Sequence, residues 1–166
     1  EEGRLRVVDG EPVGWIPHPD SPYVEAEPTL WTVAALAAAL GHADAVPPDR
    51  RAEFEAHLAT AQRAADAYHP LGKGAWNMFV NQVHPEQASP YATGLALLAL
   101  LETLEAKQPW DGSVGRRDEL LKATAAHLAG AFDAAEPGGW RGTPDASDPL
   151  SFGFTWQAYA TLLRAE

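Results

Sequence analysis

Three loop sequences in this 166-residue chain carry side chains that could transfer protons or bind a ligand. Two of them combine a histidine, a proline and an acid, as His18-Pro19-Asp20 and His84-Pro85-Glu86, and the third has Asp148-Pro149. Histidine titrates near neutral pH and a neighbouring carboxylate can orient it, so these loops are candidates for acid–base catalysis. Prolines, serines and aspartates are equally typical of turns, and a second interpretation is that the same residues order their own loops.

A pair of carboxylates, Glu25 and Glu27, stands just before Thr29. A carboxylic acid at this place could donate a proton to a bound substrate. Acidic side chains are also common at the start of a helix, where they cap backbone N–H groups and interact favourably with the helix dipole. Glu27 therefore has both a catalytic and a capping interpretation.

Each of the three loops follows a tryptophan and precedes a threonine, as Trp15/Thr29, Trp76/Thr93 and Trp140/Thr155. Trp76 and Trp140 lie 64 residues apart, and the threonines lie 64 and 62 residues apart. Such a period predicts a repeated helical unit. The tryptophans have two interpretations: they stack on a sugar, or they staple neighbouring helices through a large buried area.

The segments that must position these loops alternate in character. Residues 29–40, 93–106 and 152–164 predict Ala/Leu-rich helices that are apolar on nearly all sides, which indicates burial. Residues 48–68 and 116–135 predict amphipathic helices with one charged face. Residues 5–16 favour a small hairpin. The sequence therefore predicts one all-α domain over 1–166, with an N-terminal β arm at 1–16 and an array of helical hairpins at 17–166.

Two Gly-rich turns and one apolar helix carry a family resemblance. Gly74-Ala75-Trp76, Gly138-Gly139-Trp140 and the helix from Thr93 to Leu100 resemble repeats of the α/α-toroid superfamily of terpenoid cyclases and protein prenyltransferases. The resemblance implies a partial toroid of about five main helices, with inner helices whose N-termini gather at one rim. Glu25 and Glu27 resemble the first two acids of the class II cyclase motif, but Pro28 replaces the third.

The resemblance and the loop chemistry together place the candidate site at that rim. The catalytic candidates are His84, Glu86 and Glu27. The predicted ligand-binding residues are Trp15, His18, Asp20, Trp76, His84, Glu86, Tyr91, Trp140 and Asp148. We expect a small apolar molecule or a glycan as the ligand, and no metal or cofactor.

The composition excludes several classes of function. The absence of cysteine excludes disulfides, thiolate zinc sites of the prenyltransferase type and thioester chemistry. A net charge of −11 disfavours binding to nucleic acid. The sequence thus predicts a non-catalytic ligand-binding or scaffold domain; the alternative is a terpenoid-cyclase-like or polysaccharide-degrading enzyme.

The apolar helix at 152–164 stands at the edge of the predicted array. Because such a face invites association, we expect a homodimer or packing against another domain of a longer chain. The sequence does not identify a compartment; one interpretation is an extracytoplasmic part of a larger protein.

Overall fold

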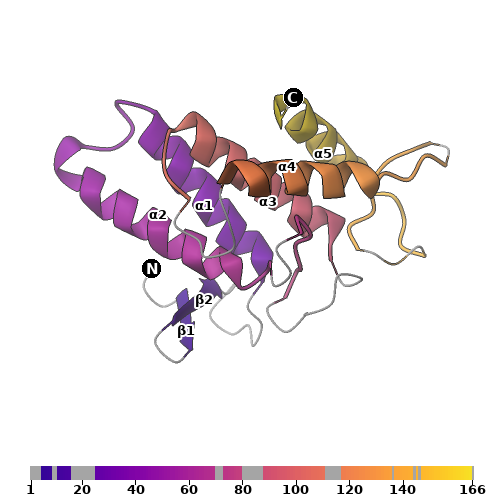
Figure 1. The fold of residues 1–166 in the computed structure, drawn as a ribbon, viewed down its shortest axis with the longest axis horizontal. Coiled ribbons are helices and arrows are strands. Elements are labelled where there is room, and N and C mark those ends of the chain that lie inside the picture. The colour runs from indigo at the N-terminus through magenta and orange to yellow at the C-terminus, as the bar shows by residue number, and fades with distance from the viewer. Residues whose placement is uncertain are drawn as a thin grey trace.

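The computed structural model describes residues 5–8, 11–15, 25–69, 73–79, 88–110, 117–135, 137–143, 145 and 147–165. Within these ranges the chain is mainly α-helical, which confirms the predicted all-α class. The helices are α1 (Ala26–Gly41), α2 (Arg51–Asp66), α3 (Pro90–Glu105), α4 (Arg117–Gly130) and α5 (Phe152–Ala165), and a short 3-10 helix, η2 (Pro48–Arg50), precedes α2 (Figure 1).

The N-terminal arm is a pair of short strands, β1 (Leu5–Val8) and β2 (Glu11–Trp15). They pair antiparallel, with Leu5 opposite Trp15 and a register shift between Arg6 and Val7. The hairpin lies beside the N-terminal end of α1 and contacts α1 and α2 through β2 (Figure 1).

We call α1, α3 and α5 the Thr helices, because each carries one of the three repeated threonines. The helices α2 and α4 are the charged helices. Figure 1 shows α1 and α5 on either side of α3, which packs against both. The charged helix α2 packs on α1, and α4 packs on α3 and α5. The predicted alternation of apolar and more polar helices is therefore present, although α5, predicted to be apolar on nearly all sides, is amphipathic.

Three predicted helix boundaries were wrong, each for a local reason. α3 begins at Pro90 and not at Thr93, because the Ser89 side chain accepts a hydrogen bond from the Ala92 N–H and caps the helix. α1 begins at Ala26, earlier than the predicted start near Pro28-Thr29, and Pro28 lies in the first turn as predicted. α4 ends at Gly130, five residues before the predicted end at 135, because glycine is a weak helix former.

The three Thr helices are expected to be buried on all sides, and α3 comes closest to this, with Leu104 near its C-terminal end 40% exposed. On α3, residues 92–97 and 99–101 are all buried. On α1, Trp31 is 44% exposed, and on α5, Tyr159 and Leu163 are 53% and 54% exposed. The three helices have similar composition, so the difference reflects how many neighbours each one has.

The apolar face predicted to run on through Phe132 is also shorter than expected. Phe132 is 46% exposed, since α4 has already ended and the chain has turned away. Among the described residues no helix is both long and apolar enough to cross a membrane.

Candidate functional site

The same hydrogen bond joins each repeated tryptophan to its threonine. The backbone N–H of Trp15 donates to Oγ1 of Thr29 at 3.0 Å, that of Trp76 to Thr93 at 3.2 Å, and that of Trp140 to Thr155 at 2.9 Å. The loop that follows Trp76 or Trp140 returns in the same way too, because Ser89 and Ser151 donate their N–H to the tryptophan carbonyls. The predicted equivalence of the three threonines is therefore confirmed at the level of individual atoms.

The two later tryptophans lie inside the protein. Trp76 is 0% exposed and Trp140 is 3% exposed. The indole N–H of Trp76 donates to Oγ1 of Thr124 on α4 at 3.1 Å, and that of Trp140 donates to the Leu128 carbonyl at 2.7 Å. Both rings thus bind neighbouring helices together, as in the stapling interpretation, and neither presents a face to solvent. Trp15 is half-buried and packs against the core.

At the N-terminal ends of the Thr helices, two of the predicted residues meet. The Tyr91 hydroxyl on α3 donates to Oε1 of Glu27 on α1 at 2.9 Å. The Tyr91 ring packs edge-on against Phe154 of α5, with 5.3 Å between ring centroids. Side chains from all three Thr helices therefore form one continuous cluster.

The burial of the phenol and the hydrogen bond between Tyr91 and Glu27 determine the pKa of Tyr91. Burial, and then the hydrogen bond to Glu27 and its charge, raise the pKa of Tyr91 to about 12. The phenol consequently stays protonated at neutral pH and acts as a donor to the carboxylate. Glu25, the other candidate acid, stands at the N-cap of α1 but its side chain makes no capping hydrogen bond.

Asp148 turns into its own loop. Its carboxylate accepts a hydrogen bond from the Thr143 hydroxyl at 3.0 Å, and its carbonyl accepts one from the Arg141 guanidinium. Arg141 also pairs with Asp133 at 2.5 Å. These contacts order the segment between Trp140 and α5, which is the loop-ordering interpretation. His18, Asp20, His84 and Glu86 lie outside the described residues.

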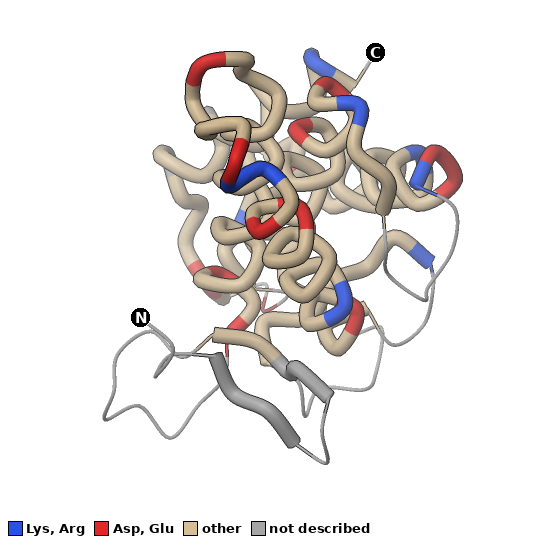
Figure 2. Tube along the Cα trace, turned by 90° about the vertical axis from the view of Figure 1, so that its left-hand side faces the viewer, with Lys and Arg blue, Asp and Glu red and all other residues tan. Residues whose placement is uncertain are grey.

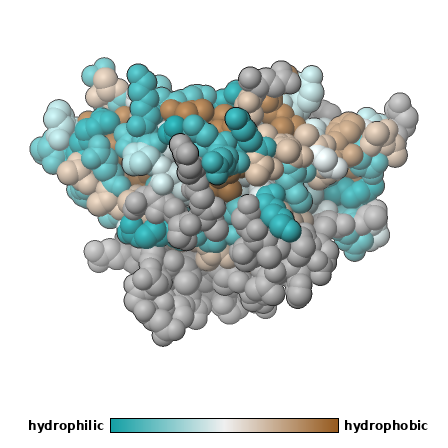
Figure 3. All heavy atoms as spheres, viewed as in Figure 1, coloured by the Kyte–Doolittle hydropathy of each residue, from teal (hydrophilic) through white to brown (hydrophobic). Residues whose placement is uncertain are grey.

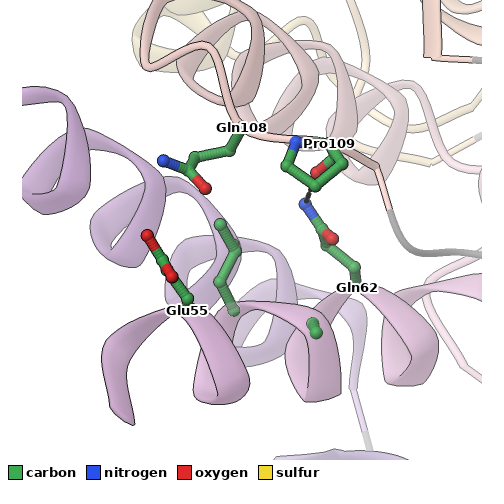
Figure 4. Close-up of a pocket in the computed structure, with 6 residues that line it drawn as sticks. Glu55, Gln62, Gln108 and Pro109 are labelled. Atoms are coloured by element: carbon green, nitrogen blue, oxygen red, sulfur yellow. Dashed lines mark hydrogen bonds between the residues drawn. The ribbon is translucent and has the colours of Figure 1, made fainter. Parts of the chain in front are cut away.

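A pocket of about 360 Å³ lies away from the predicted rim, between α2 and the segment that follows α3 (Figure 4). Its lining combines apolar and polar residues: Glu55, Leu58, Ala59, Gln62, Gln108 and Pro109. The Gln62 amide donates to the Pro109 carbonyl at 3.0 Å, so one of its polar groups is already engaged. None of the predicted site residues lines this pocket.

His69 and Gly74, which were not among the predicted site residues, lie beside Trp76. The His69 ring is 0% exposed and stacks on Trp76 with 4.5 Å between centroids. Its Nε2 accepts the Gly74 N–H at 2.9 Å, which places the imidazole proton on Nδ1. Burial, with a smaller contribution from His127, lowers the pKa of His69 to about 4. The glycine two residues before the tryptophan recurs as Gly138 and was an available signal, whereas Asp133 stands at the position equivalent to His69.

The charged residues do not build a polyanion or metal site in the described parts of the chain. Basic and acidic residues are interspersed in the view of Figure 2, which shows no continuous basic stripe. Among the described residues no group of three or more His, Asp or Glu side chains converges as metal ligands would.

Comparison with known proteins adds no relative. No protein family matches the chain, and neither a curated protein nor a solved structure is significantly similar to it. The function is therefore argued from the geometry alone.

Proposed function

We propose that this chain is a non-catalytic scaffold domain of a larger protein, built from toroid-type helical units. The observation that carries the proposal is the repeated Trp–Thr hydrogen bond at Thr29, Thr93 and Thr155. In this hydrogen bond the tryptophan and the threonine of the repeated motif hold the connection between two helices in place. This supports a structural role for the motif.

The other described candidates support the same conclusion. Trp76 and Trp140 are buried under neighbouring helices, and Asp148 is bonded within its own loop. A catalytic or sugar-binding side chain must reach its substrate. The two tryptophan rings do not face solvent, and the half-buried Asp148 carboxylate is engaged by Thr143. The parallel arrangement of α1, α3 and α5, with their N-terminal ends joined through Tyr91, supports the inner ring of a partial toroid.

One contact favours the enzymatic alternative, a cyclase-like or polysaccharide-degrading activity. Glu27 and Tyr91 lie in direct contact and are only half-buried, so a ligand could reach them. A phenol with a pKa of about 12 is nevertheless a poor acid at neutral pH, since effective acid–base groups have a pKa near the working pH. The pair is better suited to joining α1 to α3 than to transferring a proton.

The experiment that separates these functions uses Tyr91→Phe and Glu27→Gln. Binding of an oligosaccharide series and of a long-chain isoprenoid alcohol is measured by calorimetry, alongside thermal unfolding. A scaffold predicts no saturable binding to the wild-type chain, and a small loss of stability of about 1 kcal/mol or less in each variant. Saturable binding that disappears in Tyr91→Phe while the unfolding temperature is kept would overturn the proposal.

A further inference from the structure

The repeat allows each position on one Thr helix to be compared with its equivalents on the other two. Counting from Thr29, Thr93 and Thr155, the positions four and eight residues later lie on one side of the helix, which we call the trailing edge. The residues there are Val33 and Ala37 on α1, Leu97 and Leu101 on α3, and Tyr159 and Leu163 on α5.

The trailing edge is covered on two helices and open on the third. Val33 and Ala37 are each 0% exposed, and Leu97 and Leu101 are 0% and 2% exposed. Tyr159 and Leu163, at the same positions of α5, are more than half exposed. α3 packs beside α1 and α5 packs beside α3, and among the described residues no further Thr helix packs beside α5. Hydrophobic atoms reach the surface in this region of α4 and α5 in Figure 3.

The opposite side of each Thr helix, the leading edge, shows the reverse pattern. It comprises the positions one residue before and three and six residues after the threonine: Pro28, Thr32 and Ala35 on α1; Ala92, Ala96 and Ala99 on α3; Phe154, Ala158 and Thr161 on α5. All six of those on α3 and α5 are buried. On α1, Pro28 and Thr32 are half-buried and Ala35 is exposed.

Contacts inside the chain show how the two edges meet. A Cβ added to Gly94, on the trailing side of α3, would lie 2.8 Å from the ring of Phe154 on the leading edge of α5. At the far end, a Cβ added to Gly41 of α1 would lie 3.2 Å from Cβ of Ala106, just after α3. Within the chain, the leading sides of α3 and α5 thus pack against the trailing sides of α1 and α3, respectively.

The two open edges match in size and charge. α3 receives α1 on small side chains, Ala92, Ala96 and Ala99. The edge of α1 also carries small side chains, the half-buried Thr32 and the exposed Ala35, with the 44% exposed Trp31 beside them. The open edge of α5 offers the large side chains of Tyr159 and Leu163. Within Ala26–Gly41 the only charged residue is Glu27, and within Phe152–Ala165 the only one is Arg164, which is engaged by Glu102 and Glu105. Although the chain has a net charge of −11, few of its charged residues lie on these two helices, so electrostatic repulsion between the two edges is small.

From this pattern we infer that the chain binds a second copy of itself head to tail, with the trailing edge of α5 on the leading edge of α1. The contact repeats the internal α1–α3 and α3–α5 packing between two molecules. It joins two different surfaces, so each copy keeps one free edge and further copies can add until a ring closes. The inference concerns the helix edges alone and is independent of whether Glu27 and Tyr91 bind a ligand.

The test uses two variants that each close one edge, Leu163→Glu and Ala35→Glu. Both positions are exposed, so each variant should fold, as checked by circular dichroism. In sedimentation velocity the wild-type chain is expected to associate with rising concentration, and each variant alone is expected to be monomeric. An equimolar mixture is expected to form a dimer and nothing larger, because one intact α5 edge and one intact α1 edge remain. Leu104→Glu, at a 40% exposed leucine on α3 outside both open edges, is the control that should associate like the wild type.

Other occupants of the edges give different results. Association that is lost in Leu163→Glu but kept in Ala35→Glu would mean that two α5 edges meet symmetrically, which overturns the head-to-tail contact. A wild-type chain that stays monomeric at all concentrations would also overturn it and assign the edges to another helical unit. Because the chain has no cysteine, a mixture of Ala35→Cys and Leu163→Cys chains gives a direct readout: a disulfide-linked heterodimer is expected, and homodimers of Leu163→Cys alone would contradict the inference.

Discussion

The turns that lead into Trp76 and Trp140 have the same backbone and different surroundings. Gly74 and Gly138 each stand two residues before the tryptophan, with φ of +77° and +74°. After each ring the chain pairs in the same way, with Asn77 opposite Ala88 and Arg141 opposite Leu150. The conformation of the repeat is therefore set locally, by glycine at a positive φ and by the threonine that accepts the tryptophan N–H.

What surrounds the rings depends on the next helix. The Trp76 turn is enclosed: its indole bonds to Thr124 on α4, and Trp110 and His69 pack against the ring. The Trp140 turn is open on that side: its indole bonds back to Leu128 of the preceding helix, and the half-exposed Phe132 covers the ring. Both tryptophans are buried, but α4 covers the Trp76 ring, whereas the Trp140 ring is covered by Phe132 and by the helix that precedes it.

The largest expected difference between the turns is for Gly74→Ala and Gly138→Ala. Both substitutions place a side chain at a positive φ, which costs about 1–3 kcal/mol. At Gly74 the new Cβ would also lie 2.2 Å from the backbone carbonyl of Ala123. At Gly138 it would lie 3.2 Å from the Phe132 ring and 3.8 Å from the Asp133 carbonyl oxygen. We expect Gly74→Ala to lower the free energy of unfolding by more than about 4 kcal/mol, or to prevent folding, since backbone cannot yield as a side chain can.

Urea unfolding followed by circular dichroism measures this difference, with Gly138→Ala as the matched variant expected to remain folded with a loss of about 1–2 kcal/mol. If the two variants lost equal stability, the close approach of α4 to the Trp76 turn would be wrong.

The sequence allowed the repeat to be predicted because its signals are local. A tryptophan after a glycine turn and a threonine in an apolar helix recur at a fixed spacing, and the structure gives them the same hydrogen bond. The exposure of α1 and α5 could not be predicted in this way. Val33, Leu97 and Tyr159 are all large apolar residues in similar helices, and only the presence of a neighbour decides whether each is buried.

The candidate site could be predicted only in part, because local sequence signals do not reveal contacts between helices. The meeting of Glu27 with Tyr91 depends on how α1 and α3 lie side by side, which no local signal in either helix reveals. His69 was not placed among the site residues because a histidine at a helix end is usually solvated; here its ring stacks on Trp76 and accepts the Gly74 N–H.

A smaller difference should appear with pH. His69 lies seven residues before Trp76, and the equivalent residue before Trp140 is Asp133. Because the pKa of His69 is about 4 in the folded chain and 6.5 is usual, the unfolded chain binds more protons between these values. The contribution of His69 to the free energy of unfolding is therefore full above about pH 6.5 and declines as the pH falls to 4, by up to about 3 kcal/mol.

Asp133 affects the free energy of unfolding in a lower pH range than His69. The Ala135 N–H and then Arg141 lower the pKa of its carboxyl, so its contribution is kept above pH 3.8 and declines only as the pH falls through the lowered pKa. Urea unfolding of the wild type and of His69→Gln from pH 4 to 7 measures the first effect. The free energies of unfolding of the wild type and of His69→Gln should converge as the pH decreases. A constant difference between them across this range would show that the protonation of His69 is not linked to folding.

The smallest expected difference comes from removing the repeated hydrogen bond itself with Thr93→Val and Thr155→Val. Valine keeps the shape of threonine but cannot accept a hydrogen bond, so the tryptophan N–H loses its partner. Thr93 is 0% exposed, so leaving the backbone N–H of Trp76 without an acceptor should lower the free energy of unfolding by about 1–3 kcal/mol. Thr155 is half-buried, where water can replace the hydroxyl, and the expected cost is below about 1 kcal/mol. Thermal unfolding of both variants beside the wild type measures the difference. A larger loss for Thr155→Val would mean that the open turn depends on this hydrogen bond more than the enclosed one, because fewer other contacts hold it.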